Sequence, residues 1–165
     1  IRVSYQSIQR QLQRDRSLVN CFGRKVRFMG SWDNDLWKQA YSFLPQSSVV
    51  DSLNQGMVKI YNDDTICGID CCNVDILAQV HDSILMQVPL DVFKNIDDFT
   101  ELQTHVYQYV SPPLTYNNRS FKIATDSKMG FNWQGPGTNN PLGMREVKSY
   151  DDIVKLLELS HESGT

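Results

Sequence analysis

The chain has 165 residues, of which 41% are apolar and 21% are charged, and its formal net charge is −3. This composition is that of one globular domain with an apolar core, and it excludes a disordered, collagenous or disulfide-stapled chain. No run of about 18 apolar residues is present, so we expect no contact with a membrane.

Charge is distributed unevenly along the chain. Residues 1–40 hold eight Lys or Arg against three Asp, a net +5, whereas the remainder holds eight Lys or Arg against sixteen Asp or Glu, a net −8. A basic segment beside an acidic body is typical of a protein that meets a polyanion with one face. An ordinary helix with Arg on its solvated face would show the same pattern. Charge alone leaves both interpretations open.

The first forty residues predict a helix and a hairpin. Apolar residues recur at helical spacing over residues 1–16, with Gln and Arg between them, which predicts an amphipathic helix. Residues 17–28 alternate apolar and polar side chains around Asn20 and Gly23. This stretch predicts a short β-hairpin with Arg24 on its outer side.

The next helical region contains a proline. Asp33–Asp35 can cap a helix that runs towards Tyr61, but Pro45 lies inside it. Proline removes one helical hydrogen bond and clashes with the preceding turn. We therefore expect a break or kink at Pro45 and a fresh helix over residues 47–60.

Two strand-like runs follow, at residues 74–80 and 84–88, and only His81-Asp82-Ser83 separates them. They predict a β-hairpin with an acid at or next to its turn. Residues 91–110 have the spacing of another helix, which Ser111-Pro112-Pro113 would end.

The last third of the chain is less regular. Residues 121–125 read as a strand, residues 134–143 as a Gly-, Pro- and Asn-rich linker, and residues 150–159 as a short terminal helix. We therefore divide the chain into a main segment, residues 1–133, and a linker with terminal helix, residues 134–165. The mixture of helices and antiparallel hairpins predicts an α+β fold.

The cysteines do not predict a zinc site. The cluster Cys67-Gly68-Ile69-Asp70-Cys71-Cys72 has no second pair and no histidine at zinc-ligand spacing. Adjacent cysteines also do not resemble a secreted disulfide framework, so reduced thiols in a cytoplasmic protein are the expectation.

Asp82 allows two interpretations. An aspartate beside a hairpin turn commonly stabilises the turn through its own backbone. A carboxylate held on a rigid strand pair is also a suitable ligand for Mg²⁺, which prefers hard oxygen atoms. The His-Asp-Ser triplet alone favours the turn, and only its context favours the metal.

Four segments in order resemble family A (DNA polymerase I-type) DNA polymerases, especially those of phages. The first is the helix with Arg10 and Arg14 and the following Asn20-Cys21-Phe22-Gly23-Arg24-Lys25; the second is Lys38-Gln39-Ala40-Tyr41-Ser42-Phe43-Leu44-Pro45-Gln46-Ser47-Ser48. The third is Gln79-Val80-His81-Asp82, which is similar to the family's motif-C hairpin, and the fourth is Lys128-Met129-Gly130-Phe131-Asn132-Trp133. The resemblance covers about residues 1–133 and implies an antiparallel palm sheet whose motif-C hairpin packs against helices.

The resemblance also implies an activity, in which deoxynucleotides (dNTPs) are added to a primer 3′ end by two-metal nucleotidyl transfer with two Mg²⁺ ions. It makes Asp82 the catalytic metal ligand and gives His81 the role of positioning the primer. It assigns contacts with primer–template DNA to further side chains, namely Lys38, Ser42, Gln46, Gln79 and Arg24. The expected location is the cytoplasm of a bacterium or of a phage-infected host cell.

The chain departs from the family in two ways. Ser83 stands where many members carry Glu, and Ser47-Ser48 replaces the commoner Gly-Thr. The family's first metal carboxylate and its nucleotide-binding helix normally precede the segment that this chain resembles. One carboxylate cannot hold two Mg²⁺ ions. We therefore expect the chain to work with a remaining polymerase segment or subunit that carries the fingers and the first palm strand.

Two other functions remain open at this point. The basic first 40 residues could form a non-catalytic nucleic-acid-binding module, and the acidic body could be a protein-interaction domain. Asp82 separates the first alternative from the polymerase, because a binding module has no need of that carboxylate.

Overall fold

The computed structural model describes residues 5–67, 74–90, 96–116 and 118–162. Its helices are α1 (Tyr5–Asp15), α2 (Asn34–Tyr61), the single turn α3 (Asp64–Cys67), α4 (Ile96–Val110) and α5 (Tyr150–Glu162). Its strands form four antiparallel pairs: β1 (Ser17–Val19) with β2 (Lys25–Arg27), β3 (Asp75–Val80) with β4 (Ser83–Gln87), β5 (Leu114–Tyr116) with β6 (Arg119–Phe121), and β7 (Lys128–Met129) with β8 (Arg145–Glu146). The predicted α+β class is confirmed.

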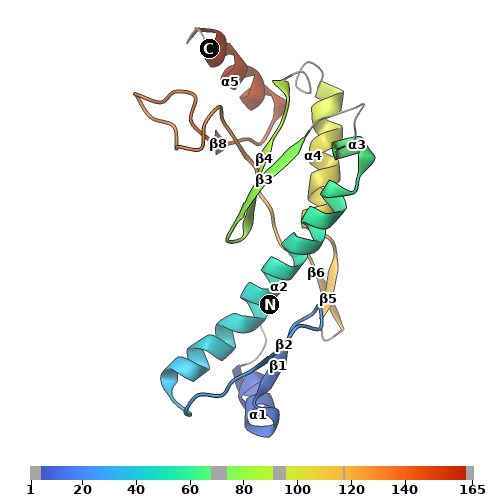
Figure 1. Ribbon diagram of the computed structural model, residues 1–165, viewed down its shortest axis with the longest axis vertical. Coiled ribbons are helices and arrows are strands. Elements are labelled where there is room, and N and C mark those ends of the chain that lie inside the picture. Colours follow the sequence, from blue (N-terminus) through green and yellow to red (C-terminus); the bar gives the residue numbers. More distant parts are fainter. Residues whose placement is uncertain (1–4, 68–73, 91–95, 117, 163–165) are drawn as a thin grey trace.

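Helix α2 is the long axis of the molecule and connects two packed regions (Figure 1). At its start it packs with α1 and the β1–β2 hairpin around a lower core of Ile8, Leu12, Leu18, Phe28, Leu36, Ala40 and Leu44. At its end it packs with α3, α4 and the β3–β4 hairpin around an upper core of Leu53, Ile60, Ile66, Val74 and Val110. One helix therefore contributes to two separate cores.

The buried face of α2 changes sides along the helix. Leu36, Ala40 and Leu44 are buried in the first half, and Leu53, Gly56 and Ile60 are buried in the second. Since successive helical residues are rotated by about 100°, the second set lies roughly half a turn around the helix from the first. The two cores therefore lie on nearly opposite sides of α2.

This two-sided packing explains why α2 is continuous through Pro45, where a break was expected. That prediction, with a separate helix over residues 47–60, is wrong. An interior proline costs a helix about 3 kcal/mol. Apolar burial on both sides of the proline offsets that cost, and Pro45 itself lies on the exposed side of the helix.

The other predicted elements have mixed outcomes. Both hairpins, at residues 17–28 and 74–88, are confirmed, and α4 ends at Val110, before Ser111 and the two prolines. The predicted strand over residues 121–125 is wrong beyond its first residue, because the chain instead turns at Asn118, which has a left-handed φ of 57°, and pairs β6 with β5. Residues 1–4, residues 91–95 and the adjacent pair Cys71 and Cys72 lie outside the described residues.

The last segment folds back onto the main body. Strands β7 and β8 pair across the residues that read as a linker, which form the loop between them. Helix α5, predicted at residues 150–159, is confirmed, and its Ile153 packs with Phe99 of α4 and with Val147 in a third core. Within the described ranges, no helix is long and apolar enough to cross a membrane.

Candidate metal ligand and nucleic-acid interface

The β3–β4 hairpin presents two residues at its tip. Val80 pairs with Ser83, so His81 and Asp82 form the turn between them. Along β3, exposed side chains alternate with partly buried ones. Gln79, two residues before the turn, is exposed, and Ile76 packs against the upper core. Because successive strand side chains point to opposite faces, this alternation fixes which face of the hairpin meets the core.

The turn is held by groups other than the Asp82 carboxylate. The Ser83 hydroxyl donates to the Val80 carbonyl at 2.8 Å. His81 adopts a left-handed φ of 54°, a conformation that costs a non-glycine residue of order 1 kcal/mol and recurs at functional sites. The described residues provide no hydrogen-bond or ion-pair partner for the exposed carboxylate of Asp82. A turn-stabilising role would show the carboxylate bonded to nearby backbone N–H groups, so the geometry favours an outward-facing ligand.

Three predicted DNA contacts lie on one face of α2. Lys38, Ser42 and Gln46 are four residues apart, so they form a row about 12 Å long on one side of the helix. By the same rotation, the row lies on the helix face that also bears Leu53 and Ile60. These two residues are buried in the upper core, further along α2. The row therefore lies on the face of α2 that, further along the helix, packs against α4 and the β3–β4 hairpin.

The row is exposed in part and weakly bonded. The Lys38 ammonium lies 3.4 Å from a carboxylate oxygen of the equally exposed Asp35, a geometry in which ion pairs contribute little. The Ser42 hydroxyl donates to the Gln39 carbonyl at 3.1 Å. Gln46 is exposed. These side chains can exchange their present contacts for phosphate or base-edge contacts at small cost.

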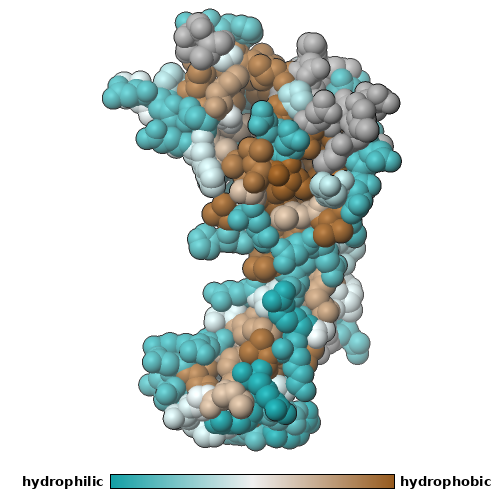
Figure 2. All heavy atoms as spheres, in the orientation of Figure 1, coloured by the Kyte–Doolittle hydropathy of each residue, from teal (hydrophilic) through white to brown (hydrophobic). Residues whose placement is uncertain are grey.

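The β3–β4 hairpin borders a hollow in the surface. Figure 2 shows the surface hollowed on its left side, between the region packed around the lower core and the part of the surface formed by the β3–β4 hairpin. In Figure 1 the tip of that hairpin points to the same side. His81 and Asp82 form the turn at this tip, and Gln79 lies two residues before the turn on β3.

Arg24 is not part of this arrangement. Its guanidinium Nε donates to Asp51 Oδ2 at 2.9 Å, and its Nη2 bonds the other carboxylate oxygen. Asn20 donates to the same carboxylate at 2.6 Å and accepts the Arg24 backbone N–H at 3.0 Å. Asp51 lies on the side of α2 opposite the row. Arg24 therefore holds the β1–β2 turn against α2, whereas the sequence predicted a DNA contact.

Asp51 is a residue that sequence reasoning missed. It is 27 residues from Arg24 along the chain, and no local pattern links the two. Its burial at 8% exposure could not be inferred either, because neighbouring α2 positions carry small polar residues. Only the tertiary packing of the hairpin against α2 brings the pair together.

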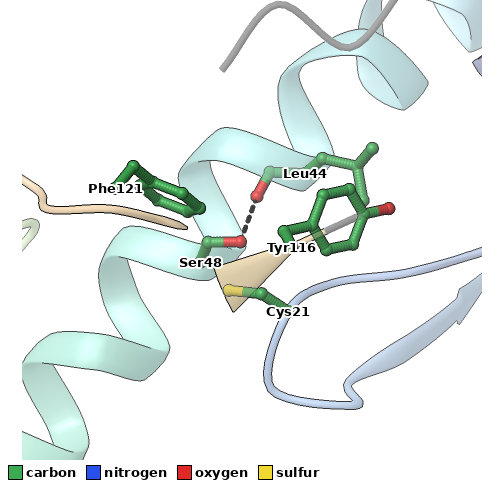
Figure 3. A pocket seen from close by; sticks show the side chains of 5 residues that line it. All are labelled: Cys21, Leu44, Ser48, Tyr116 and Phe121. Atoms are coloured by element: carbon green, nitrogen blue, oxygen red, sulfur yellow. Dashed lines mark hydrogen bonds between the residues drawn. The ribbon is translucent and has the colours of Figure 1, made fainter. Parts of the chain in front are cut away.

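A small cavity lies where the β5–β6 hairpin meets the lower region (Figure 3). Its volume of about 10 Å³ is at the lower limit for one water molecule, so it cannot hold an organic ligand. Burial raises the pKa of the Tyr116 hydroxyl that lines it. The remaining lining residues are Cys21, Leu44, Ser48 and Phe121. This cavity is a packing feature.

The described residues do not form a two-ion metal site by themselves. Asp82 supplies one carboxylate at the hairpin tip, and nowhere in the described ranges do three or more His, Cys, Asp or Glu side chains gather at metal-binding distance. Mg²⁺ needs further oxygen ligands, from substrate phosphates or from other protein groups.

Comparison with known proteins adds no assignment, because no protein-family model, curated protein or solved structure matches the chain. What the chain does must be inferred from its own residues and from where the fold places them.

Proposed function

We propose that this chain is the C-terminal palm portion of a family A DNA polymerase. The observation that carries the proposal is the Asp82 carboxylate at the tip of the β3–β4 hairpin, which has no hydrogen-bond or ion-pair partner among the described residues, together with the row of Lys38, Ser42 and Gln46 on α2. The reaction is template-directed addition of dNTPs to a primer 3′ end. The first metal carboxylate and the nucleotide-binding helix come from a polymerase segment outside this chain.

Each residue of the arrangement has a role suited to its chemistry. Asp82 provides one carboxylate of a shared Mg²⁺ site. His81, next to it in the turn, contacts the primer terminus. Gln46 and Gln79 carry amides that both donate to and accept from minor-groove edges, and Lys38 neutralises a phosphate. Ser42 adds a hydroxyl between Lys38 and Gln46.

A non-catalytic nucleic-acid-binding module is the second candidate function. The region packed around the lower core favours this second function, because Arg10, Lys25 and Arg27 are all exposed there. These residues would give sequence-independent phosphate binding. Such a module gives no role to the Asp82 carboxylate, which has no partner in the part of the chain that the structure describes, or to the left-handed His81, and for this reason we place it second.

The proposal is tested by reconstitution. The coding sequence before Ile1, or a neighbouring gene, is first searched for the Asp-Tyr-Ser-type strand of the family and its nucleotide-binding helix. Adding the encoded segment to this chain should produce Mg²⁺-dependent primer extension and raise the Tm together, because a partner that binds only the folded state stabilises it.

Two results would contradict the proposal. One is primer extension by the purified 165-residue chain alone, which would mean that other groups hold the metals. The other is a chain whose Tm and activity do not respond to the added segment, which would favour the binding module.

A further inference from the structure

The loop between β7 and β8 is closed by its own side chains. Asn132 and Asn140 exchange amide hydrogen bonds of 2.9 and 3.0 Å, and Asn140 also donates to the Gly135 carbonyl at 3.0 Å. Backbone bonds from Phe131 to Leu142, and from Met144 to Gln134, join the two sides of the loop. A segment that reads as a linker is therefore tied together across its whole length.

Two glycines allow the loop to close. A Cβ atom on Gly130 would lie 2.5 Å from the Met144 backbone nitrogen, and one on Gly143 would lie 2.6 Å from the Asn140 amide nitrogen. Real Cβ atoms do not approach other atoms so closely, so no larger residue fits at either position. The close packing fixes the loop before any ligand arrives, which lowers the entropy lost on binding.

This closed loop carries two exposed aromatic side chains. Phe131 is 41% exposed and Trp133 is 58% exposed, on either side of Asn132, whose amide turns into the loop. In the part of the chain that the structure describes, neither ring contacts another ring or a cation. By contrast, the Trp32 ring lies 5.2 Å from the Trp37 ring, centroid to centroid, and 4.3 Å from the Arg16 guanidinium.

The loop itself carries no acidic side chain. Residues 127–145 contain Lys128 and Arg145 but no Asp or Glu, and the nearest acids along the chain are Asp126 and Glu146, at the base of the loop. Lys128 is exposed at the base of the loop. Figure 1 shows the loop on the same side of α2 as the tip of the β3–β4 hairpin. The loop thus lies on the side on which the proposed function places the DNA.

We propose that Phe131 and Trp133 stack with the bases of a single-stranded stretch of the nucleic acid, with Lys128 at its phosphates. The inference rests on the proposed function, because that function supplies the nucleic acid. Stacking on aromatic rings is tolerant of sequence, since every base has a π face. The loop holds a single strand that extends from the primer–template without reading its bases.

The test measures binding of a fluorescent oligothymidine of about 16 nucleotides to the full 165-residue chain. Trp133→Ala and Phe131→Ala should each weaken binding by about 5- to 100-fold, the range for loss of one stacked ring. Trp133→Phe should recover most of the loss. Tyr61→Ala is the matched control, because Tyr61 is 73% exposed at the far end of α2, and it should leave binding unchanged.

The outcomes separate this inference from the proposed function. Unchanged oligothymidine affinity in both ring variants would overturn the stacking site, even if the reconstituted enzyme extends primers. Ring-dependent binding without any extension would remove only the polymerase assignment. If the ring variants instead bind the oligonucleotide normally and lose the Tm rise caused by the added segment, the loop is a protein contact and the inference is wrong.

Discussion

The β1–β2 and β3–β4 hairpins both pack on α2, but the polar residues of their turns differ in how they are bonded. At the β1–β2 turn, Asn20 and Arg24 bond the buried carboxylate of Asp51. At the β3–β4 turn, the carboxylate of Asp82 has no partner among the described residues, and the turn is closed by Ser83 instead. Charged groups at the β1–β2 turn therefore stabilise the fold, whereas the charged group at the β3–β4 turn is exposed to solvent.

This difference separates structural residues from candidate functional ones. A buried carboxylate must be paired, because an unpaired charge costs several kcal/mol in the interior. An exposed carboxylate has no such requirement, so the fold alone gives no reason for Asp82 to be acidic. By the same reasoning the Arg24 guanidinium is already paired with Asp51, whereas Lys38 has only a largely exposed ion pair with Asp35 and is the more available of the two for a DNA contact.

The largest expected effect on stability follows removal of the buried partner. Asp51→Ala removes the acceptor of the Arg24 guanidinium and one of the two acceptors of the Asn20 amide, which keeps its bond to Ser47, and should lower the free energy of unfolding by about 1–3 kcal/mol. Asp82→Ala should change it by less than about 0.5 kcal/mol, as is usual for exposed positions. Urea unfolding of both variants provides the comparison, and equal losses would erase the distinction between the two turns.

A smaller effect of opposite sign is expected at His81. His81→Gly removes the left-handed strain and should raise the free energy of unfolding by about 0.5–1 kcal/mol, net of the added flexibility of the unfolded chain. The same variant should weaken primer binding in the completed enzyme, because it lacks the imidazole. His81→Asn, which tolerates the conformation, is the control for the turn. A gain in stability with unchanged primer affinity would leave His81 without a functional role.

The salt dependence of DNA binding should distinguish Lys38 from Arg24. Lys38→Ala should reduce the slope of log K against log salt for duplex DNA by about 0.9, the value for one phosphate contact. Arg24→Ala should leave the slope unchanged and lower stability instead, since Asp51 already neutralises the guanidinium. The slopes are measured between about 50 and 200 mM salt. A reduced slope in Arg24→Ala would show that this residue reaches a phosphate after all.

The smallest expected effect concerns Asp152, whose carboxylate, like that of Asp51, accepts hydrogen bonds within the fold. The Lys148 backbone N–H and the Ser149 hydroxyl at the start of α5 lower the pKa of Asp152. A lowered pKa contributes stability above the ordinary value for Asp, and that contribution is lost as the pH falls through the folded-state pKa. Asp152→Asn should therefore be less stable than the parent chain at pH 7, with the difference shrinking below about pH 4.

Local sequence patterns predicted the elements whose buried residues recur at one regular spacing. Two strand-like runs at residues 74–80 and 84–88, with only three residues between them, predicted the β3–β4 hairpin, and its Ile76, Ile84 and Met86 pack against the upper core. The spacing of apolar residues likewise predicted α1 and α5. The break at Pro45 was wrong because a local rule ignored the packing of α2 on both sides of the proline.

The candidate site was predictable only in part. Asp82, Lys38, Ser42 and Gln46 come from motifs that are local in sequence, and their common side of α2 follows from spacing. The pairing of Arg24 with Asp51 depends on residues far apart in the chain, so no motif could predict it. Phe131 and Trp133 belong to the fourth motif, directly before the Gly- and Pro-rich residues 134–143, but only the structure shows that both rings are exposed.

The most direct test of the central claim is the primer-extension rate of Asp82→Asn in the enzyme completed by its missing segment. The account predicts a loss of at least about 100-fold, with primer–template Kd unchanged, because the carboxylate acts on the developing charge and not on the duplex. Ser83→Ala, which loses one hydrogen bond to Val80, should retain nearly full activity. Near-normal extension by Asp82→Asn would contradict the assignment of this hairpin to metal binding.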